Sequence, residues 1–428
     1  MTTSYPTVKL GRVARIISGV GFPHPFQGRE SGEYPFLKVS DLATQRSGYS
    51  VIGAQNWVSR GDLSTLGARL APTDSVVFPK VGAALLKNPR RLLRQPSAMD
   101  NNLMAVVPQV GDPRFWVYAL SIIDLGELAG SGPLPFVNET QIRDLRVSFP
   151  NELEQRRIAD FLDAETARID SMVSTIRRLR SVLSERKEVH RSLALRGVHS
   201  HGPRTLHPML GDLPDSWPVL PLKRLVPRIG VGVVVDPSSY FSERGLPFLR
   251  GSNITDGGIN LQDVRCISEA DSRKLWRSRL SSGDVVVIRA GYPGRAAVVP
   301  KDLEGANCAS ILILKKGDRL TPKYLEVYFN SPLGKSYVDS VRYGAAQEQI
   351  NVSHVVDFMC PTPSPNEQHQ IISEIEKNER PIAALQQKLS AQAGLLAVRR
   401  QALITAAVTG QFDVTTASGR NVTDGVTA

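Results

Sequence analysis

Basic side chains gather in one stretch of each half of the chain, where they could bind the phosphates and base edges of a nucleic acid. They are Lys80, Lys87, Arg90, Arg91 and Arg94 in the first half, and Arg273, Lys274, Arg277, Arg279, Arg289 and Arg295 in the second. Lysine and arginine grip phosphates, and both also form paired hydrogen bonds with guanine in the major groove. Each of these residues fits an ordinary solvated surface equally well, and residue type alone does not separate base contacts from phosphate contacts.

The overall charge favours a polyanionic partner. The chain has 52 Lys and Arg against 41 Asp and Glu, a formal net charge of +11 and an isoelectric point of about 9.6. Such an excess is typical of nucleic-acid binding, although acidic membrane surfaces attract the same charge. The N-terminus lacks the apolar segment of a secretory signal and no run of 18 apolar residues occurs, so we expect a soluble, cytoplasmic protein without a membrane partner.

Motifs that would give the chain chemistry of its own are missing from the sequence. It has no GxxxxGKS or GxxxxGKT loop and no NPPY or DPPY run, and Gly230-Val-Gly232 lacks the third glycine of a dinucleotide-binding turn. The 7 histidines and 3 cysteines are scattered, which favours neither a metal site nor a disulfide framework. We therefore expect no catalytic residue, no metal and no cofactor in this chain. A nuclease built from dispersed acidic residues is the enzymatic alternative.

A long internal repeat organises the chain. Three pairs of segments match: 5–13 (YPTVKLGRV) with 217–225 (WPVLPLKRL), 34–42 (YPFLKVSDL) with 246–254 (LPFLRGSNI), and 154–158 (EQRRI) with 367–371 (EQHQI). Their displacements of 212, 212 and 213 positions are nearly equal, which indicates a duplication. The segments between these matching pairs differ strongly. Two domains that recognise different targets would need such differences, and random drift would also produce them.

Each copy ends in a long predicted helix. Asn151 with Glu154, and Ser364 with Glu367, have the spacing of capping boxes at the helix starts. Apolar residues then recur every seven positions, which is typical of coiled-coil packing. The predicted seam consists of Leu162, Ile169, Ile176, Leu183, Ile375, Ile382, Leu389, Leu396 and Leu403. We expect the two helices to pair antiparallel within the chain; the alternative is that each helix packs back on its own head.

These patterns predict an α+β fold with two similar, β-rich globular heads, each followed by a long helix, and a pseudo-two-fold internal repeat. The expected division is 1–150 for the first head, 151–200 for the first helix, 201–216 for a linker, 217–363 for the second head, 364–412 for the second helix and 413–428 for a polar tail. With the helices antiparallel, the heads would face a DNA duplex in opposite orientations, about one helical turn apart.

This order of head, helix, head and helix resembles the specificity subunits of type I restriction-modification systems. The matching pieces are 34–42 and 246–254 in the heads, 149–163 and 362–376 at the helix starts, and 406–412 at the end. The resemblance covers almost the whole chain. It implies that each head is a target recognition domain that reads one half of a bipartite, asymmetric DNA sequence.

The resemblance also implies partners. The helices would set the unread gap between the half-sites and dock two methyltransferase (modification) subunits, which bind S-adenosylmethionine and methylate adenine. Restriction subunits would complete the assembly, and ATP and magnesium would belong to the partner subunits. The expected function is thus that of a non-catalytic DNA specificity subunit. The alternatives are a stand-alone nuclease and a coiled-coil adaptor that does not bind DNA.

Overall fold

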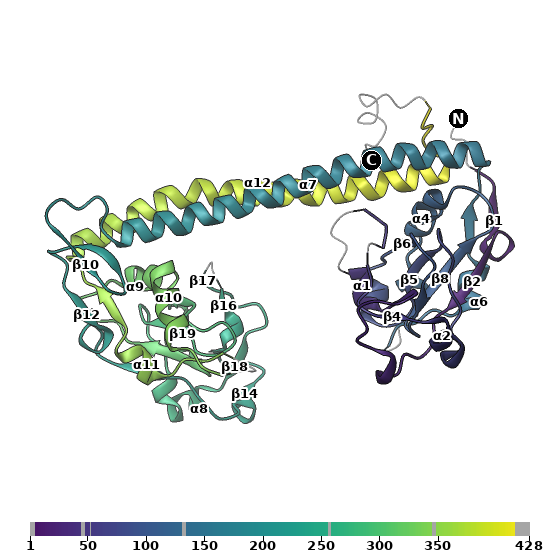
Figure 1. Ribbon diagram of the computed structural model, residues 1–428. Helices are drawn as coiled ribbons and strands as arrows, with labels where there is room; N and C mark the ends of the chain where they lie inside the picture. The colour runs from purple at the N-terminus through teal and green to yellow at the C-terminus, as the bar shows by residue number, and fades with distance from the viewer. Residues whose placement is uncertain are drawn as a thin grey trace. The chain divides into compact units, whose positions relative to one another are not determined.

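The computed structural model describes residues 5–43, 48–51, 53–130, 134–255, 258–344 and 348–415. The chain divides into two compact units, each with one globular head and parts of two long helices (Figure 1). The first unit joins Met1–Arg177 with Leu389–Ala428, and the second unit runs from Arg178 to Lys388.

A four-stranded antiparallel sheet forms the centre of the first head. Its strand order is β2 (Ala14–Ser18), β8 (Leu103–Pro108), β5 (Val76–Pro79) and β6 (Arg91–Leu92). Side chains alternate between the two faces of a strand. Val76 and Phe78 of β5 therefore join one core with Trp116, whereas Val77 joins another core with Leu37. Because both faces of this strand are covered, its sequence reads as a continuous apolar run.

Smaller elements complete the first head. Strand β3 (Tyr34–Leu37) pairs antiparallel with β4 (Trp57–Val58) and parallel with β7 (Ala98–Met99), and β1 (Thr7–Lys9) pairs with β9 (Arg146–Ser148). The helices of this head are α1 (Val39–Ala43), α2 (Arg60–Leu66), α3 (Ala83–Leu86), α4 (Pro113–Ser121), α5 (Leu125–Leu128) and α6 (Glu139–Asp144).

The second head repeats this strand order. Its four-stranded sheet has the order β13 (Ile229–Val231), β22 (Ile311–Leu314), β19 (Val285–Ile288) and β20 (Ala296–Val298). Strand β15 (Leu246–Leu249) again has one antiparallel neighbour, β18 (Arg265–Ile267), and one parallel neighbour, β21 (Asn307–Cys308). Strand β12 (Val219–Pro221) pairs with β23 (Met359–Pro361) as β1 does with β9. The shared order confirms the internal repeat.

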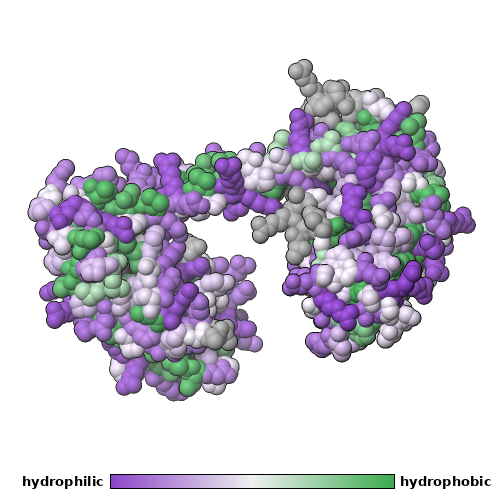
Figure 2. All heavy atoms as spheres, in the orientation of Figure 1, coloured by the Kyte–Doolittle hydropathy of each residue, from purple (hydrophilic) through white to green (hydrophobic). Residues whose placement is uncertain are grey.

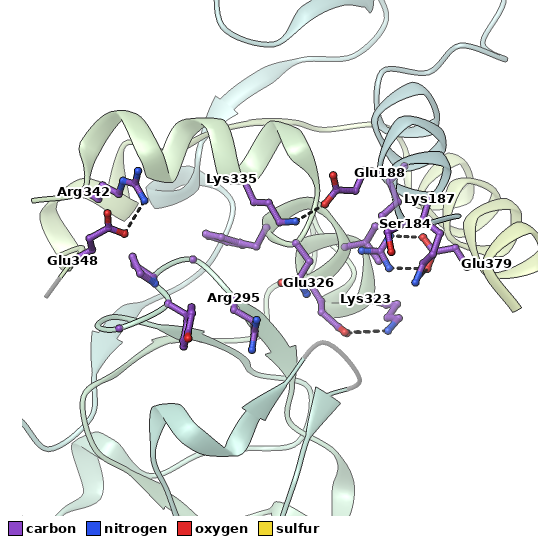
Figure 3. Close-up of a pocket in the computed structure, with 18 residues that line it drawn as sticks. Ser184, Lys187, Glu188, Arg295, Lys323, Glu326, Lys335, Arg342, Glu348 and Glu379 are labelled. Atoms are coloured by element: carbon purple, nitrogen blue, oxygen red, sulfur yellow. Dashed lines mark hydrogen bonds and ion pairs between the residues drawn. The ribbon is translucent and has the colours of Figure 1, made fainter. Parts of the chain in front are cut away.

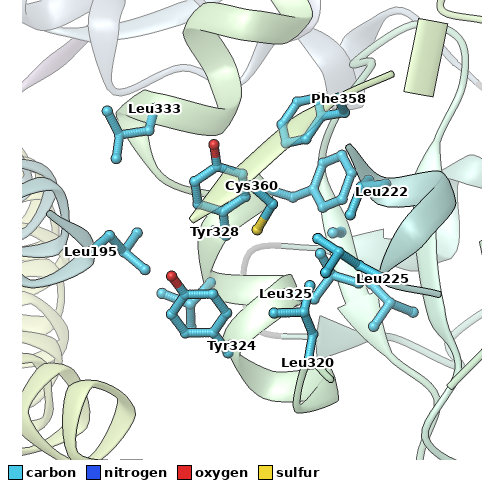
Figure 4. Packing of buried hydrophobic residues seen from close by; sticks show 14 of the residues in the cluster. Leu195, Leu222, Leu225, Leu320, Tyr324, Leu325, Tyr328, Leu333, Phe358 and Cys360 are labelled. Atoms are coloured by element: carbon cyan, nitrogen blue, oxygen red, sulfur yellow. The ribbon is translucent and has the colours of Figure 1, made fainter. Parts of the chain in front are cut away.

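Further elements of the second head are β14 (Phe241–Ser242), the pair β16 (Ile254–Thr255) and β17 (Gly258–Ile259), and the helices α8 (Glu269–Lys274), α9 (Pro322–Phe329), α10 (Pro332–Val341) and α11 (Val352–Val356). Aromatic side chains of α9 fill the core (Figure 4). Tyr328 packs edge-on against Phe358 and donates its hydroxyl to the carbonyl of Met359 at 2.7 Å. This hydrogen bond satisfies the polar end of a buried ring.

The segment 201–216 differs from the expected linker. It contains a β-hairpin of β10 (Arg204–His207) and β11 (Gly211–Pro214), and Leu210 and Leu213 are buried in the core of the second unit. The guanidinium of Arg204 also donates to the carbonyls of Arg196 and Gly197, each at 2.8 Å. The expectation that 201–216 is a linker is therefore corrected. Its glycines, prolines and histidines suggested a loop, but the two buried leucines and the contacts of Arg204 fix the segment in place.

The two long helices, α7 (Glu152–Leu195) and α12 (Pro365–Thr409), run antiparallel in each unit (Figure 1). In the second unit Gln386 donates to Ser184 at 3.0 Å, and Arg191 Nη2 donates to Glu379 Oε2 at 2.6 Å. Ser184 and Arg191 are thus seven residues apart on α7, and their partners Gln386 and Glu379 are seven residues apart in the opposite direction on α12. In the first unit Arg400 lies 3.6 Å from Asp170. The antiparallel coiled coil of the expected fold class is confirmed.

The predicted seam positions lie in a narrow buried stripe. Leu162, Ile169, Ile176, Ile375, Ile382, Leu389 and Leu403 are at most 9% exposed, and Leu183 and Leu396 are half-buried. Apolar residues beside the stripe are open, since Met172, Leu179 and Leu385 are 46%, 47% and 44% exposed. The helix ends also pack on the heads: Ile158 shares a core with Phe115. Packing of a helix on its own head, the alternative arrangement, therefore occurs at the helix ends together with the pairing.

The Glu-Gln motif at each helix start anchors a head to its helix. The side chain of Gln155 is 1% exposed and accepts the backbone N–H of Asp112 at 3.2 Å. Gln368 is 0% exposed and accepts the N–H of Thr321 at 2.7 Å. Asp112 and Thr321 are the N-caps of α4 and α9. In both units the motif thus joins the first turn of a long helix to the cap of a head helix.

Candidate nucleic-acid interface

Each head has a hollow where its central strand ends and a second segment crosses beside it. In the first head this segment is 134–138 and in the second head it is 348–351; we call both the strap. The strap of the first head is bonded to the residues after β5: Val137 donates its N–H to the carbonyl of Lys80 at 2.9 Å. In the second head Ile350 donates to the carbonyl of Arg289 at 3.0 Å. The two hollows therefore share one backbone arrangement.

Side chains around the two hollows differ. The hollow of the first head has a volume of about 450 Å³ and is lined among others by Lys80, Val81 and Phe136. The hollow of the second head, of about 500 Å³, is lined among others by Arg289, Gln349 and Ser252. Besides Lys80, the first hollow is lined mainly by apolar side chains, together with Ser18, Asn138 and Glu139, whereas the second combines Arg289 with the hydrogen-bonding side chains of Ser252, Ser310 and Gln349.

The candidates of the first head do not form one cluster. Lys80 lines the hollow, and Lys87 follows α3 as an exposed residue. Arg94 is exposed and donates to Ser50 at 2.9 Å. Arg91 is half-buried, and burial together with the nearby charge of Arg400 lowers the pKa of its guanidinium. It thus lies toward the helix pair.

Arg90 is a correction to the sequence analysis, because it is a structural residue rather than an exposed DNA contact. It is 4% exposed, and burial lowers the pKa of its guanidinium. It donates to the carbonyls of Pro89 and Ile123 at 3.0 and 3.2 Å and lies 4.9 Å over the ring of Phe78. The local density of basic residues concealed this role, because a buried arginine that binds carbonyls has no signature in the sequence.

The candidates of the second head fall into two groups. Those on and after α8 are Arg273, Lys274, Arg277 and Arg279. Lys274 pairs with Asp271 at 2.8 Å and Arg277 lies 5.3 Å over the ring of Trp276. The second group flanks the turn after β19, where Arg289 donates to Asn351 at 3.2 Å and Arg295 lies 5.5 Å from the ring of Tyr292. The structure thus brings only Arg289 and Arg295 to the turn beside the hollow.

Three residues at these places were missed by the sequence analysis. Phe136 and Tyr292 are 56% and 74% exposed, and Gln349 is half-buried at the edge of its hollow. A search for charged residues does not find them. The available signal was the pairing of Val137 and Asn138 with Ile350 and Asn351 between the two copies, because it marks the strap in each head.

A larger hollow of about 620 Å³ in the second unit is lined by residues of α7, α9 and α10 (Figure 3). Many of its charges are paired with one another. Lys335 of α10 lies 2.8 Å from Glu188 of α7, and Arg342 lies 2.7 Å from Glu348. The ion pair of Lys335 with Glu188 therefore links the head to the long helix. Because Lys335 and Arg342 are already paired with carboxylates, they are less suited to binding phosphate than the cations at the straps.

Within the described residues no group of three or more His, Cys, Asp and Glu side chains has the arrangement of a metal site. In the same part of the chain no helix is both long and apolar enough to cross a membrane. The surface seen in Figure 2 is largely hydrophilic, with scattered apolar residues on each head.

Comparisons with known proteins agree with this architecture. The sequence matches no protein-family model. It is 22% identical over 393 residues to the specificity subunit of the type I restriction enzyme EcoBI of Escherichia coli, covering 87% of this chain and 79% of that subunit. It is 22% identical over 242 residues to the specificity subunit of the Escherichia coli K12 enzyme EcoKI, covering 54% of this chain and 50% of that subunit.

A similar fold occurs in a solved structure from work on the complex assembly and conformational transition of the type I restriction-modification system. Its TM-score is 0.62 at 18% sequence identity, and the match covers 96% of this chain and 98% of the solved one. This comparison supports the fold, with two heads and two long helices.

Proposed function

We propose that this chain, whose curated homologues are specificity subunits of type I restriction enzymes, selects the DNA sequence on which such an enzyme acts. Each head reads one half of a bipartite, asymmetric target. The observation that carries this proposal is that both heads have the same strand order. Each head is also hydrogen-bonded to a long helix through an equivalent glutamine, Gln155 in the first unit and Gln368 in the second. Two heads that share a backbone fold but differ in their side chains suit the recognition of two different half-sites.

Electrostatics support DNA as the target. The net charge of +11 favours a polyanion, because binding of lysine and arginine to phosphates releases counterions from the duplex. Exposed cations such as Lys87, Arg94 and Arg273 are the candidates for phosphate contacts, whereas Lys80 and Arg289 stand at the hollows of the heads. A DNA target also implies a cytoplasmic location for the chain.

The long helices are the proposed docking site for two modification subunits. Apolar side chains remain exposed on them outside the buried stripe, among them Leu395 at 70% and Val398 at 68% on α12. Exposed apolar groups on a helix favour a protein partner. In this proposal the modification subunits bind S-adenosylmethionine and methylate adenine, the restriction subunits bring ATP and magnesium, and this chain contributes recognition without catalysis.

The test is to co-express the chain with its modification subunits and to sequence the methylated DNA of the host. The expected result is one bipartite, asymmetric motif that carries methyladenine and disappears when the chain is omitted. Absence of any motif would contradict the proposal. Magnesium-dependent cleavage of plasmid by the purified chain alone would instead favour the nuclease.

Exchange of one head sharpens this test. Replacing residues 5–150 with the corresponding head of another specificity subunit should change one half of the motif and leave the other half intact. A change in both halves would show that the heads do not read independently.

A further inference from the structure

We propose that Phe136 and Gln349 are equivalent specificity-determining residues, one in each strap, and that each contacts a base edge in its own half-site. Phe136 contacts the methyl group of a thymine, and Gln349 together with Arg289 binds the major-groove edge of a purine. This inference rests on the proposed function, because it assigns the side chains with which the two heads read DNA.

Phe136 and Gln349 occupy equivalent positions in the two heads. Phe136 forms an isolated antiparallel bridge with Val81, and Gln349 forms the same bridge with Ala290. The following glycines, Gly82 and Gly291, have φ values of +75° and +89° and donate to strap carbonyls at 2.8 and 3.1 Å. The backbone frame around each position is thus held by the same hydrogen bonds and by a glycine of positive φ, although Gly82 leads into α3 and Gly291 into the turn before β20.

Phe136 is an exposed apolar side chain with a second one beside it. Its side chain is 56% exposed in the strap, and Leu134 beside it is 61% exposed. Apolar surface in water is unfavourable, so neighbouring exposed apolar side chains mark a binding surface more often than an isolated one does. Lys80 lines the same hollow together with Glu139, and its ammonium group supplies a donor for a phosphate beside the apolar contact.

The second head places polar and charged side chains at the equivalent hollow. Arg289 donates one guanidinium N–H to Asn351 at 3.2 Å, which orients the side chain while leaving other donors for a ligand. Gln349 lines the same hollow, so a donor and acceptor pair stands beside a fixed cation. Arginine pairs with guanine O6 and N7, and glutamine pairs with adenine N6 and N7. This set therefore fits a purine.

The frame is kept while its side chains change class, from phenylalanine to glutamine. Residues needed only for folding at equivalent places tend to keep their class, as Phe36 and Phe248 do in β3 and β15. A change from an apolar to a hydrogen-bonding side chain at an open position instead suits readers of two different sequences.

The experiment uses the full chain in complex with its modification subunits. Phe136→Gln should relax or change one position in one half of the methylated motif, and Gln349→Phe should do so in the other half only. Duplexes carrying the native motif are then prepared with each thymine of the first affected half replaced by deoxyuridine, which lacks only the methyl group. Loss of the methyl at one position should weaken binding of the native complex about threefold to tenfold and leave binding of Phe136→Gln unchanged.

Val110→Gln is the matched control, because Val110 is a 49% exposed apolar residue of the first unit outside the hollow. It should leave the motif and the deoxyuridine effect as in the native chain. A second variant, Phe136→Leu, keeps an apolar side chain in case the glutamine variant does not fold. Because leucine is shorter, it should lose most of the deoxyuridine effect.

The outcomes separate this inference from the proposed function. A native complex that methylates a bipartite motif, combined with strap variants that keep both the motif and the full deoxyuridine effect, overturns the inference and leaves the function standing. A native complex that marks no DNA overturns both.

Discussion

The indole N–H of Trp217 donates to Glu367 Oε1 at 3.0 Å, and in the first unit the hydroxyl of Tyr5 donates to Glu154 Oε1 at the same distance. Tyr5 and Trp217 begin the first repeated segment, whereas the two glutamates begin the motif at the helix starts. In each unit the first repeated segment is therefore bonded to the repeated segment at the helix start. These contacts attach head to helix in both units, and in the proposed function base reading falls to residues that differ between the copies.

The glutamine of this attachment is the first residue to test. Gln368→Ala should destabilise the second unit by about 1–3 kcal/mol, because the buried N–H of Thr321 loses its acceptor. The change is measured by denaturant unfolding of the full chain. Gln370→Ala, at an exposed position of the same helix, is the matched control and should stay within about 0.5 kcal/mol of the native value. Equal stability of the two variants would refute the anchoring role.

The tyrosine attachment predicts sensitivity to alkali. Burial, and then the hydrogen bond to Glu154, raise the pKa of Tyr5 to about 12 from an ordinary value of 10. A raised pKa in the folded state means that this stabilisation is complete below pH 10 and is lost as the pH rises from about 10 to about 12. Circular dichroism should show the first unit losing stability in that window.

Tyr5→Phe should remove part of this alkaline sensitivity and lower stability at neutral pH by about 1 kcal/mol, because the bond to Glu154 is gone. Tyr292→Phe is the control, since that side chain is 74% exposed. If the alkaline transition of Tyr5→Phe has the same midpoint and slope as that of the native chain, Tyr5 does not contribute to the transition.

Arg90 and Lys87 should separate stability from DNA binding. Arg90→Met keeps contact with Phe78 but removes the donor to the Pro89 carbonyl and one of the two donors to the Ile123 carbonyl, which Asn88 also binds at 2.9 Å, so the first unit should lose about 1–3 kcal/mol. Lys87→Ala should keep the native melting temperature and weaken DNA binding, with a salt dependence reduced by about one phosphate contact. Calorimetry and binding titrations at several salt concentrations measure both effects. Native stability with reduced DNA affinity in Arg90→Met would restore Arg90 as a DNA contact.

The sequence predicted the features that repeat with a period. The seven-residue recurrence of Ile169, Ile176 and their counterparts on α12 requires a narrow buried stripe, and the displacement near 212 residues requires two equivalent heads. These patterns determine fold class because burial follows them directly.

Features held by single long-range contacts were not predictable. Arg90 is buried through carbonyl contacts with residues up to 33 positions away, and Leu213 is buried through packing against a head that the local sequence does not describe. The straps, which we propose as binding surfaces, were also missed, because Phe136 and Gln349 share a place in the backbone and no side-chain chemistry. If the heads recognise two different half-sites, their recognition positions must diverge, and similarity between the copies then cannot reveal them.

The length of the helix pair should set the gap between the half-sites. Removing residues 173–179 from α7 and 391–397 from α12 deletes one heptad from each helix, and the pairing of Asp170 with Arg400 places the two deletions opposite each other. Seven residues correspond to about 10 Å of helix, which is about three base pairs at 3.4 Å per step. The methylated motif of the double deletion should keep both half-sites and lose about three base pairs of gap.

The single deletions provide the contrast. When one heptad is removed from α7 alone, the buried stripe of α12 is seven residues longer than the stripe it packs against. Leu389 and its neighbours then lose their partners, or the longer helix must bulge. Each single deletion should therefore lower the melting temperature and reduce methylation, whereas the double deletion should restore both. An unchanged gap in the double deletion would show that the spacing is set by something other than the two helices.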